Sequence, residues 1–304
     1  MKIALQFPGQ GSQAEMYLHA LPAHPAVLSV LQDATEALGY DVLSLDSRTA
    51  LQSTVSVQLG LLVAGVSFAR FLVSEGVNVE AAAGMSVGAF SAAVVAGALT
   101  LDTALRFVQR RAELMEDVCG SGYGMAVVSG LRESQVKSLA ADGGVSLANL
   151  NSLTQFVLAG KRDTLERILP MAVAAGATTA RMLRMSTASH IPELEGAAAE
   201  LLEFAKGFPM QDASIPLFSN RTARPIRKAE DIREDLAMNM AHPVRWLDVQ
   251  TALQGYSPEL LLEAPPGHSL THLSQESFAE CVVLAAADVG WDLLLRETRK
   301  VTSA

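Results

Sequence analysis

A serine between two glycines, Ser86 in the string GMSVG, is the residue of this sequence best suited to covalent chemistry. A serine hydroxyl is a poor nucleophile until a base takes its proton. The frame G-x-S-x-G is typical of a strand-to-helix elbow, in which glycines remove the Cβ atoms that would clash. In such an elbow the N–H of Val87, at the helix start, would stabilise an oxyanion. The alternative is a serine in a small-residue packing helix, and the string alone leaves both open.

His190 is the histidine whose position best suits a base for Ser86. It lies in STASHIPEL, where a predicted strand ends and Pro192 opens a helix. Strand ends at domain junctions are where α/β proteins place functional groups, although a helix-capping histidine is the alternative. No carboxylate stands ready beside it, so a backbone carbonyl is a possible orienting partner. The other histidines either lack an obvious partner or flank a turn or helix start: His19, His24, His242, His268 and His272.

Arg111 is the candidate for binding an anion. Residues 101–117 predict an amphipathic helix, in which Arg110 lies on the wet face and Arg111 at the edge of the apolar face. An arginine there needs an anionic partner, because burying an unpaired guanidinium is costly. Two partners stay open: an internal carboxylate, or the carboxylate of a ligand held by the guanidinium fork.

The elements around these residues predict an α/β protein with an inserted small domain. A strand over 2–7, helices over 25–38 and 55–75, and a strand at 79–86 precede a helix over 87–99. Residues 122–187 then show the order β-α-β-β-α-β of a ferredoxin-like domain. We expect a large α/β domain made of residues 1–121 and 188–304, whose final strand is PELLLEA at 258–264. The cleft between the two domains is the expected ligand site.

Composition excludes several classes of function. The formal net charge is −9 and no long basic run exists, so nucleic acid is a poor candidate partner. The most apolar segment, 59–73, is interrupted by Arg70 and is too short to span a bilayer, and the N-terminal segment does not resemble a signal peptide. We therefore expect a cytoplasmic protein without a membrane partner. Cys119 and Cys281 are expected to be buried core thiols, and no motif predicts a metal site.

Several motifs together resemble the malonyl-CoA:acyl-carrier-protein transacylase family. They occur in the family's order along essentially the whole chain: FPGQGSQ, GMSVG, RRAELM, NLNS with QFVLAG, S-x-x-S-H, HPVRW and LEAPPGHSLT. The resemblance implies an α/β-hydrolase-like large domain with a ferredoxin-like insertion. It also implies an acyltransferase that moves a malonyl group from malonyl-CoA to the phosphopantetheine-type thiol of an acyl carrier protein.

The resemblance implies roles for individual residues. Ser86 matches the serine that accepts the acyl group and His190 the general base. Asn239, shortly before HPVRW, matches the residue whose backbone carbonyl orients that histidine.

Three more residues match positions that bind the substrate. Arg111 matches the arginine that pairs with the malonyl carboxylate, and the N–H groups of Gln10 and Val87 match the oxyanion hole. Malonyl-CoA and the carrier protein are then the partners. No resident cofactor is expected, because the carrier supplies the reactive thiol.

Two departures from the family pattern indicate a branch. The usual elbow of fatty-acid-synthesis members is GHSLGE, whereas this chain has Met85 for the histidine and Ala89 for the glutamate. SVGAF is more similar to the transacylase (epsilon) subunit of malonate decarboxylase. The alternatives are a transacylase of fatty acid or polyketide synthesis, a serine thioesterase or hydrolase, and a non-catalytic binding subunit.

Overall fold

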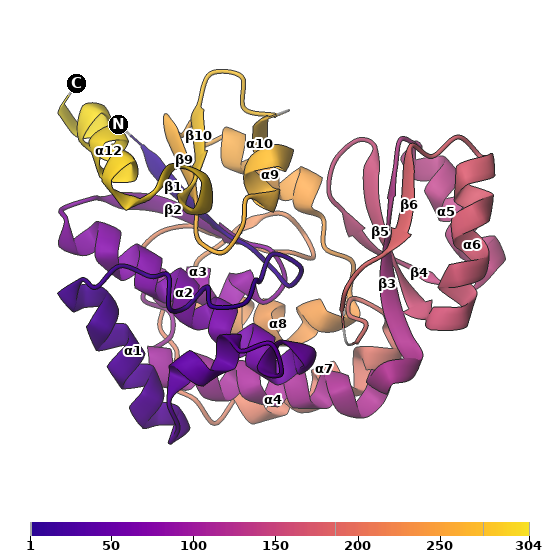
Figure 1. The fold of residues 1–304 in the computed structure, drawn as a ribbon, viewed down its shortest axis with the longest axis horizontal. Coiled ribbons are helices and arrows are strands. Elements are labelled where there is room, and N and C mark those ends of the chain that lie inside the picture. The colour runs from indigo at the N-terminus through magenta and orange to yellow at the C-terminus, as the bar shows by residue number, and fades with distance from the viewer. Residues whose placement is uncertain (1, 186, 276, 304) are drawn as a thin grey trace.

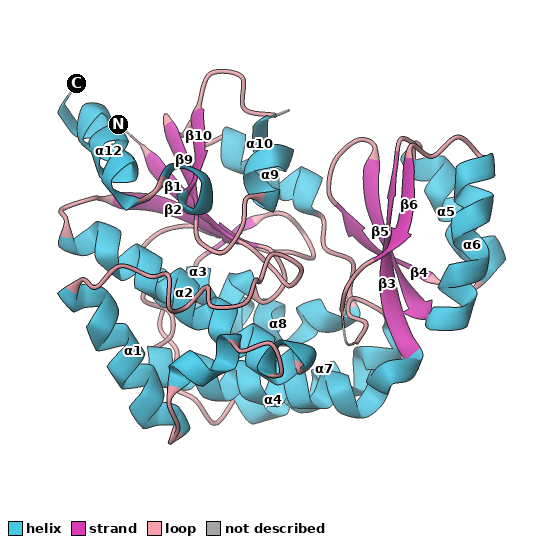
Figure 2. Ribbon diagram, viewed as in Figure 1, coloured by secondary structure: helices cyan, strands magenta, loops and turns pink. Residues whose placement is uncertain are grey.

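The computed structural model describes residues 2–185, 187–275 and 277–303, which form one six-stranded and one four-stranded sheet (Figures 1 and 2). The strand order of the large sheet is β10-β9-β1-β2-β7-β8, and all neighbours are parallel except β7 and β8. Its strands are β1 (Ile3–Phe7), β2 (Val79–Gly84), β7 (Leu217–Phe218), β8 (Pro225–Ile226), β9 (Leu260–Glu263) and β10 (Val282–Ala285).

Helices cover both faces of the large sheet. Successive side chains along its strands point to opposite faces and pack into two different hydrophobic clusters. Ile3, Leu5 and Phe7 of β1 pack into one cluster, and Ala4 packs into the other. The first cluster is built with α1 (Pro25–Leu38), α2 (Thr54–Ser74), α3 (Gly88–Val95), α4 (Leu101–Cys119), α7 (Glu195–Ala205), α8 (Ala229–Met238), α11 (Ala286–Val289) and α12 (Trp291–Ser303). The second is built with α9 (Trp246–Gln254) and α10 (Ser269–Gln275).

Helix α2 is apolar around most of its circumference, as expected of a helix inside a core. By length and composition it is the one helix among the described residues that could cross a membrane. However, 83% of its most apolar stretch is buried inside the protein. Its hydropathy is therefore accounted for by packing.

The small sheet and its two helices follow one another along the chain in the ferredoxin-like order β-α-β-β-α-β. Its strands are β3 (Tyr123–Ser129), β4 (Ser146–Leu150), β5 (Gln155–Lys161) and β6 (Thr179–Met182), arranged β4-β5-β3-β6 and all antiparallel. One face packs on α5 (Glu133–Gly143) and α6 (Arg162–Ala174), which lie on its outer side in Figure 1. Met125, Val127 and Val157 point to the opposite face and line a cavity shared with the large sheet. The predicted α/β class, with a large α/β part and a small antiparallel sheet, is confirmed by the solved structures compared below.

The HPVRW segment ties the two sheets together. Val244 accepts a hydrogen bond from the N–H of Leu150 (2.9 Å) and donates one to the carbonyl of Ala148 (2.8 Å), so it extends the edge of β4. The next residue, Arg245, donates its N–H to the carbonyl of Asn220, which follows β7 (2.9 Å). This segment therefore fixes the small sheet against the carboxyl edge of the large one.

Some predicted elements differ from the structure. PELLLEA is not the final strand, because β10 follows it and pairs in parallel with β9. The segment IPLFSN, 215–220, forms a strand only at Leu217–Phe218, since Pro216 and the turn after Phe218 leave little room for a ladder. Cys119 is buried as expected, but Cys281 is partly exposed.

Candidate active site

The site lies at the carboxyl edge of the large sheet. The loops after β1, β2 and β7 carry Gln10, Ser86 and Asn220, and the segment after β9 leads into α10, which carries Leu270. In an open α/β sheet the carboxyl ends of parallel strands meet at the same edge, and ligands bind there. A cavity of about 320 Å³ opens at this edge, between the large sheet and the inner face of the small sheet.

Ser86 lies on the elbow that the sequence predicts, between β2 and α3. Its φ of +54° is in the left-handed region, which is strained for a residue with a side chain. Asn220 holds this conformation: its Oδ1 accepts from the N–H of Ser86 (2.8 Å) and its Nδ2 donates to the carbonyl of Gly84 (2.8 Å). The Asn220 side chain thus supplies the hydrogen-bond partners that the N–H of Ser86 and the carbonyl of Gly84 do not find in the backbone of the turn.

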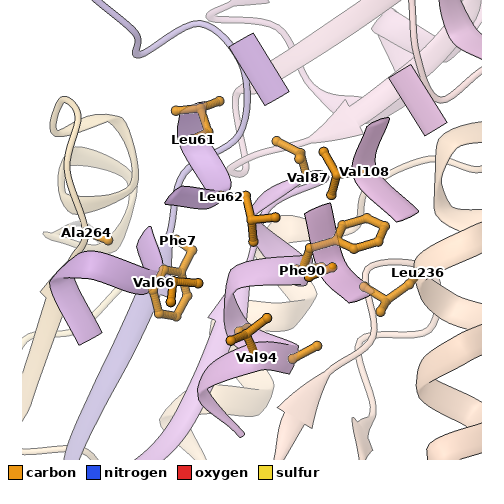
Figure 3. Packing of buried hydrophobic residues seen from close by; sticks show 14 of the residues in the cluster. Phe7, Leu61, Leu62, Val66, Val87, Phe90, Val94, Val108, Leu236 and Ala264 are labelled. Atoms are coloured by element: carbon orange, nitrogen blue, oxygen red, sulfur yellow. The ribbon is translucent and has the colours of Figure 1, made fainter. Parts of the chain in front are cut away.

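Two glycines let the elbow form. A Cβ at Gly84 would overlap the backbone of Gly88, and a Cβ at Gly88 would overlap the carbonyl of Phe7. The side chain of Val87 packs with Phe90, Leu62 and Val108 in the core (Figure 3). The backbone of Val87 is therefore held between the core and the loop after β1.

His190 makes the contact with Ser86 that a general base requires. Its Nε2 lies 2.8 Å from Ser86 Oγ, while its Nδ1 lies 2.7 Å from the carbonyl oxygen of Asn239 and 3.0 Å from that of His242. Carbonyls only accept hydrogen bonds, so Nδ1 carries the proton and Nε2 presents its lone pair to the serine hydroxyl. The backbone-carbonyl partner expected at Asn239 is present, and His242 adds a second one.

Burial keeps this imidazole neutral. His190 is 2% exposed, and burial, reinforced by the charge of Arg111, lowers its pKa from 6.5 to about 4. The two carbonyls oppose this shift but do not reverse it. At neutral pH the ring is therefore neutral, and its unprotonated Nε2 can accept the proton of Ser86.

Arg111 is more deeply buried than the predicted edge position, at 0% exposure. Its Nη1 donates to Gln58 Oε1 (2.6 Å), and its Nη2 donates to Ser86 Oγ (3.1 Å) and Asn239 Oδ1 (3.2 Å). In the described ranges no Asp or Glu forms an ion pair with it, so the internal salt bridge considered above is absent there. Neighbouring Arg110, in contrast, pairs with Glu113 and Glu200.

Among the residues that the structure describes, the charge of Arg111 therefore lacks a counter-ion. Burial lowers its pKa to about 9, which still leaves it protonated at neutral pH. A ligand carboxylate that replaced one of the neutral acceptors would form a charge-assisted pair beside Ser86 Oγ.

The two N–H groups expected to form the oxyanion hole lie beside the nucleophile. Gln10 and Ser86 both line the cavity, and Val87 follows Ser86 directly. Neither the Gln10 nor the Val87 N–H has a hydrogen-bond partner among the described residues. Both are thus free to donate, and Gln10 lies on the cavity wall itself.

Of the two residues that depart from the family pattern, one lines the cavity. Met85 is on its wall, whereas Ala89 is buried in the core below the elbow. Of the two departures, only Met85 can therefore change the polarity of the cavity wall.

Sequence reasoning missed three contributors, all of them uncharged: Gln58, Asn220 and the carbonyl of His242. The clue to Gln58 was a polar residue inside an apolar helix. Asn220 and the His242 carbonyl depend on contacts between distant segments, which a local pattern does not reveal.

Four of the remaining histidines face a carboxylate, among them His242, whose Nε2 lies 3.8 Å from Glu195 Oε2. His19 pairs with Asp46 (3.0 Å), His24 caps α1 and faces Glu75 (3.4 Å), and His268 pairs with Asp288 (2.7 Å). His272 lines the cavity. Ser186 of the S-x-x-S-H motif lies outside the described residues.

Comparison with known proteins agrees on one family. The model of the acyl transferase domain matches residues 6–292. The malonyl CoA-acyl carrier protein transacylase of Escherichia coli (strain K12) is 33% identical over 285 residues, which are 90% of this chain and 92% of that protein. The structure of the transacylase of the same name from Coxiella burnetii superposes with a TM-score of 0.93 at 28% identity, covering 99% of this chain and 98% of that one.

A second solved structure is a complex. It contains a type II polyketide synthase acyl-carrier protein bound to its malonyl-transacylase. This chain matches it with a TM-score of 0.92 at 30% identity, over 99% of this chain and 100% of that one.

The pH dependence of Ser86 reactivity tests the neutral imidazole. We expect the rate at which a sulfonyl fluoride modifies Ser86 to hold down to about pH 5.5 and to fall by half near the lowered pKa of His190, about 4. A half-fall near 6.5, the ordinary value for histidine, would contradict this account. The unfolded chain binds this proton more tightly, so the fold loses stability below pH 6.5, and circular dichroism must show folded protein at each point.

Proposed function

The chain belongs to the acyl transferase family that contains the malonyl-CoA:acyl-carrier-protein transacylases, and on that premise we propose that it moves a malonyl group from malonyl-CoA to the thiol of a carrier protein. The observation that carries the proposal is that one hydroxyl, Ser86 Oγ, contacts both a neutral histidine and an unpaired buried arginine. The histidine supplies the base and the arginine binds a carboxylate.

The first half of the proposed reaction forms an acyl-enzyme. His190 Nε2 takes the proton of Ser86 Oγ, and the oxygen attacks the thioester carbonyl of malonyl-CoA. The N–H groups of Gln10 and Val87 donate to the oxyanion that forms. The carbon–sulfur bond then breaks, and the CoA sulfur leaves with the proton from Nε2. A malonyl ester remains on Ser86.

The second half transfers the malonyl group to the carrier. The carrier thiol gives its proton to His190 Nε2 and its sulfur attacks the ester. Ser86 Oγ leaves and recovers the proton. The sequence is a ping-pong acyl transfer that uses no resident cofactor, since the carrier brings the thiol.

Arg111 gives the proposed reaction its preference for malonyl over acetyl. A malonyl carboxylate next to the ester pairs with the guanidinium, whereas an acetyl group leaves that buried charge without a counter-ion.

For the carrier we propose the acyl carrier protein of a malonate decarboxylase. This finer assignment is supported by the similarity of SVGAF to that branch and by the presence of Met85, in place of histidine, on the cavity wall. A carrier of fatty acid or polyketide synthesis is the alternative, and the compared complex contains a carrier of the polyketide kind.

Labelling identifies the nucleophile. Incubation with radiolabelled malonyl-CoA should leave label on Ser86, because the ester survives until a thiol arrives. Ser86→Ala should abolish the label, and Ser91→Ala, in the helix that follows, should retain it. Label that persists on the Ser86→Ala protein would refute the assignment.

Truncating the arginine tests acyl selectivity. Arg111→Ala should lower malonyl transfer by about 10- to 100-fold more than acetyl transfer, since only malonyl loses a charge-assisted pair. The comparison is of kcat/KM for malonyl-CoA and acetyl-CoA, with Arg110→Ala as the matched control. Equal losses for both acyl groups would mean that Arg111 is structural.

An exchange assay distinguishes the carriers. We expect malonyl transfer to a malonate-decarboxylase carrier protein to exceed transfer to a fatty-acid-type carrier. The reverse order would assign the protein to the alternative branch. CoA release that ignores both carriers would indicate a thioesterase, and tight carrier binding without acyl exchange would indicate a binding subunit.

A further inference from the structure

One buried amide, that of Gln58, joins Arg111 to the loop after β1. Gln58 lies on α2 and is 0% exposed. Its Oε1 accepts from Arg111 Nη1 (2.6 Å), and its Nε2 donates to Gln10 Oε1 (3.1 Å) and to Met115 Sδ (3.4 Å). Both ends of the amide are therefore used, one toward the guanidinium and one toward the residue whose N–H is a candidate for the oxyanion hole.

Whether residue 58 is neutral or negatively charged matters, because it is one of the few groups that contact the Arg111 guanidinium. Its other acceptors, Ser86 Oγ and the side-chain oxygen of Asn239, are also neutral. A buried guanidinium that touches only neutral acceptors is hydrogen-bonded but not neutralised, and removing it from water is costly. Glutamate has almost the shape of glutamine, and in place of Gln58 it would supply the missing counter-ion.

We propose that Gln58 is a specificity-determining positioning residue: its neutral amide aims Arg111 without neutralising it and so reserves the charge for an acyl group with a carboxylate. The inference rests on the proposed function and names the feature that selects its substrate class. Gln58 acts through Arg111 and does not touch the reacting atoms.

The second contact of the amide extends its role to the loop after β1. Because Gln58 Nε2 donates to Gln10 Oε1, the same side chain that aims Arg111 also holds Gln10 in place. A carboxylate at position 58 would lose this donor, but the Gln10 amide can rotate by half a turn and donate instead. Selectivity and loop position are therefore separable by substitution.

The decisive variant is Gln58→Glu, with Gln58→Met as the control of similar size that adds no charge. Acyl-enzyme formation with malonyl-CoA and with acetyl-CoA is followed by intact-protein mass spectrometry. We expect Gln58→Glu to lower malonyl loading by about 10- to 100-fold and to change acetyl loading far less, since the new carboxylate replaces that of malonyl. Gln58→Met should lower malonyl loading, because Arg111 loses the acceptor that aims it, but should still load malonyl in preference to acetyl, because Arg111 stays unpaired.

The outcomes separate this inference from the proposed function. If the wild-type protein forms no malonyl-enzyme, the proposed function fails and this inference falls with it. If the wild type loads malonyl but Gln58→Glu keeps its acyl preference, the inference alone is overturned. Equal losses of both acyl groups in both variants would also overturn it, because they would show that Gln58 only supports the fold.

Discussion

The site is organised around a full positive charge that is buried with no counter-ion in the described part of the chain. The Arg111 guanidinium is sealed from water, touches three neutral acceptors, and reaches the nucleophile itself at 3.1 Å. An unpaired buried charge costs several kcal/mol, so a fold retains one only where something supplies its partner. The same charge helps to keep His190 neutral, which links the carboxylate-binding group to the base.

Backbone strain is the second constraint. Ser86 and His190 both have positive φ angles, +54° and +63°, and each is held by partners from distant segments. Asn220 accepts from the N–H of Ser86, while the carbonyl of Met240 accepts from that of His190 (2.6 Å). Hydrogen bonds from the loops after β7 and α8 thus bring together two residues that are 104 positions apart in the chain.

The parts of the fold and site that depend on local sequence patterns could be predicted from the sequence. The elbow of Ser86 follows from the spacing of two glycines, and the small sheet follows from strands and helices that succeed one another directly along the chain. Periodicity placed Arg111 near the apolar face, but full burial depends on α2, which packs against α4 from a distant part of the sequence. Gln58 and Asn220 were missed because neutral amides gain their roles only from such long-range contacts. The strand β10 was missed because its few apolar residues are equally compatible with a buried helix segment.

The most direct test of the uncompensated charge is the thermal stability of two acyl-enzymes. The protein loaded with malonyl on Ser86 and the protein loaded with acetyl differ only by one carboxylate. If that carboxylate pairs with Arg111, calorimetry should give the malonyl form a Tm higher by about 2–5 °C, the shift expected for one charge-assisted pair in a chain of this size. Equal Tm values, or a lower one for the malonyl form, would show that Arg111 does not pair with the carboxylate of the acyl group.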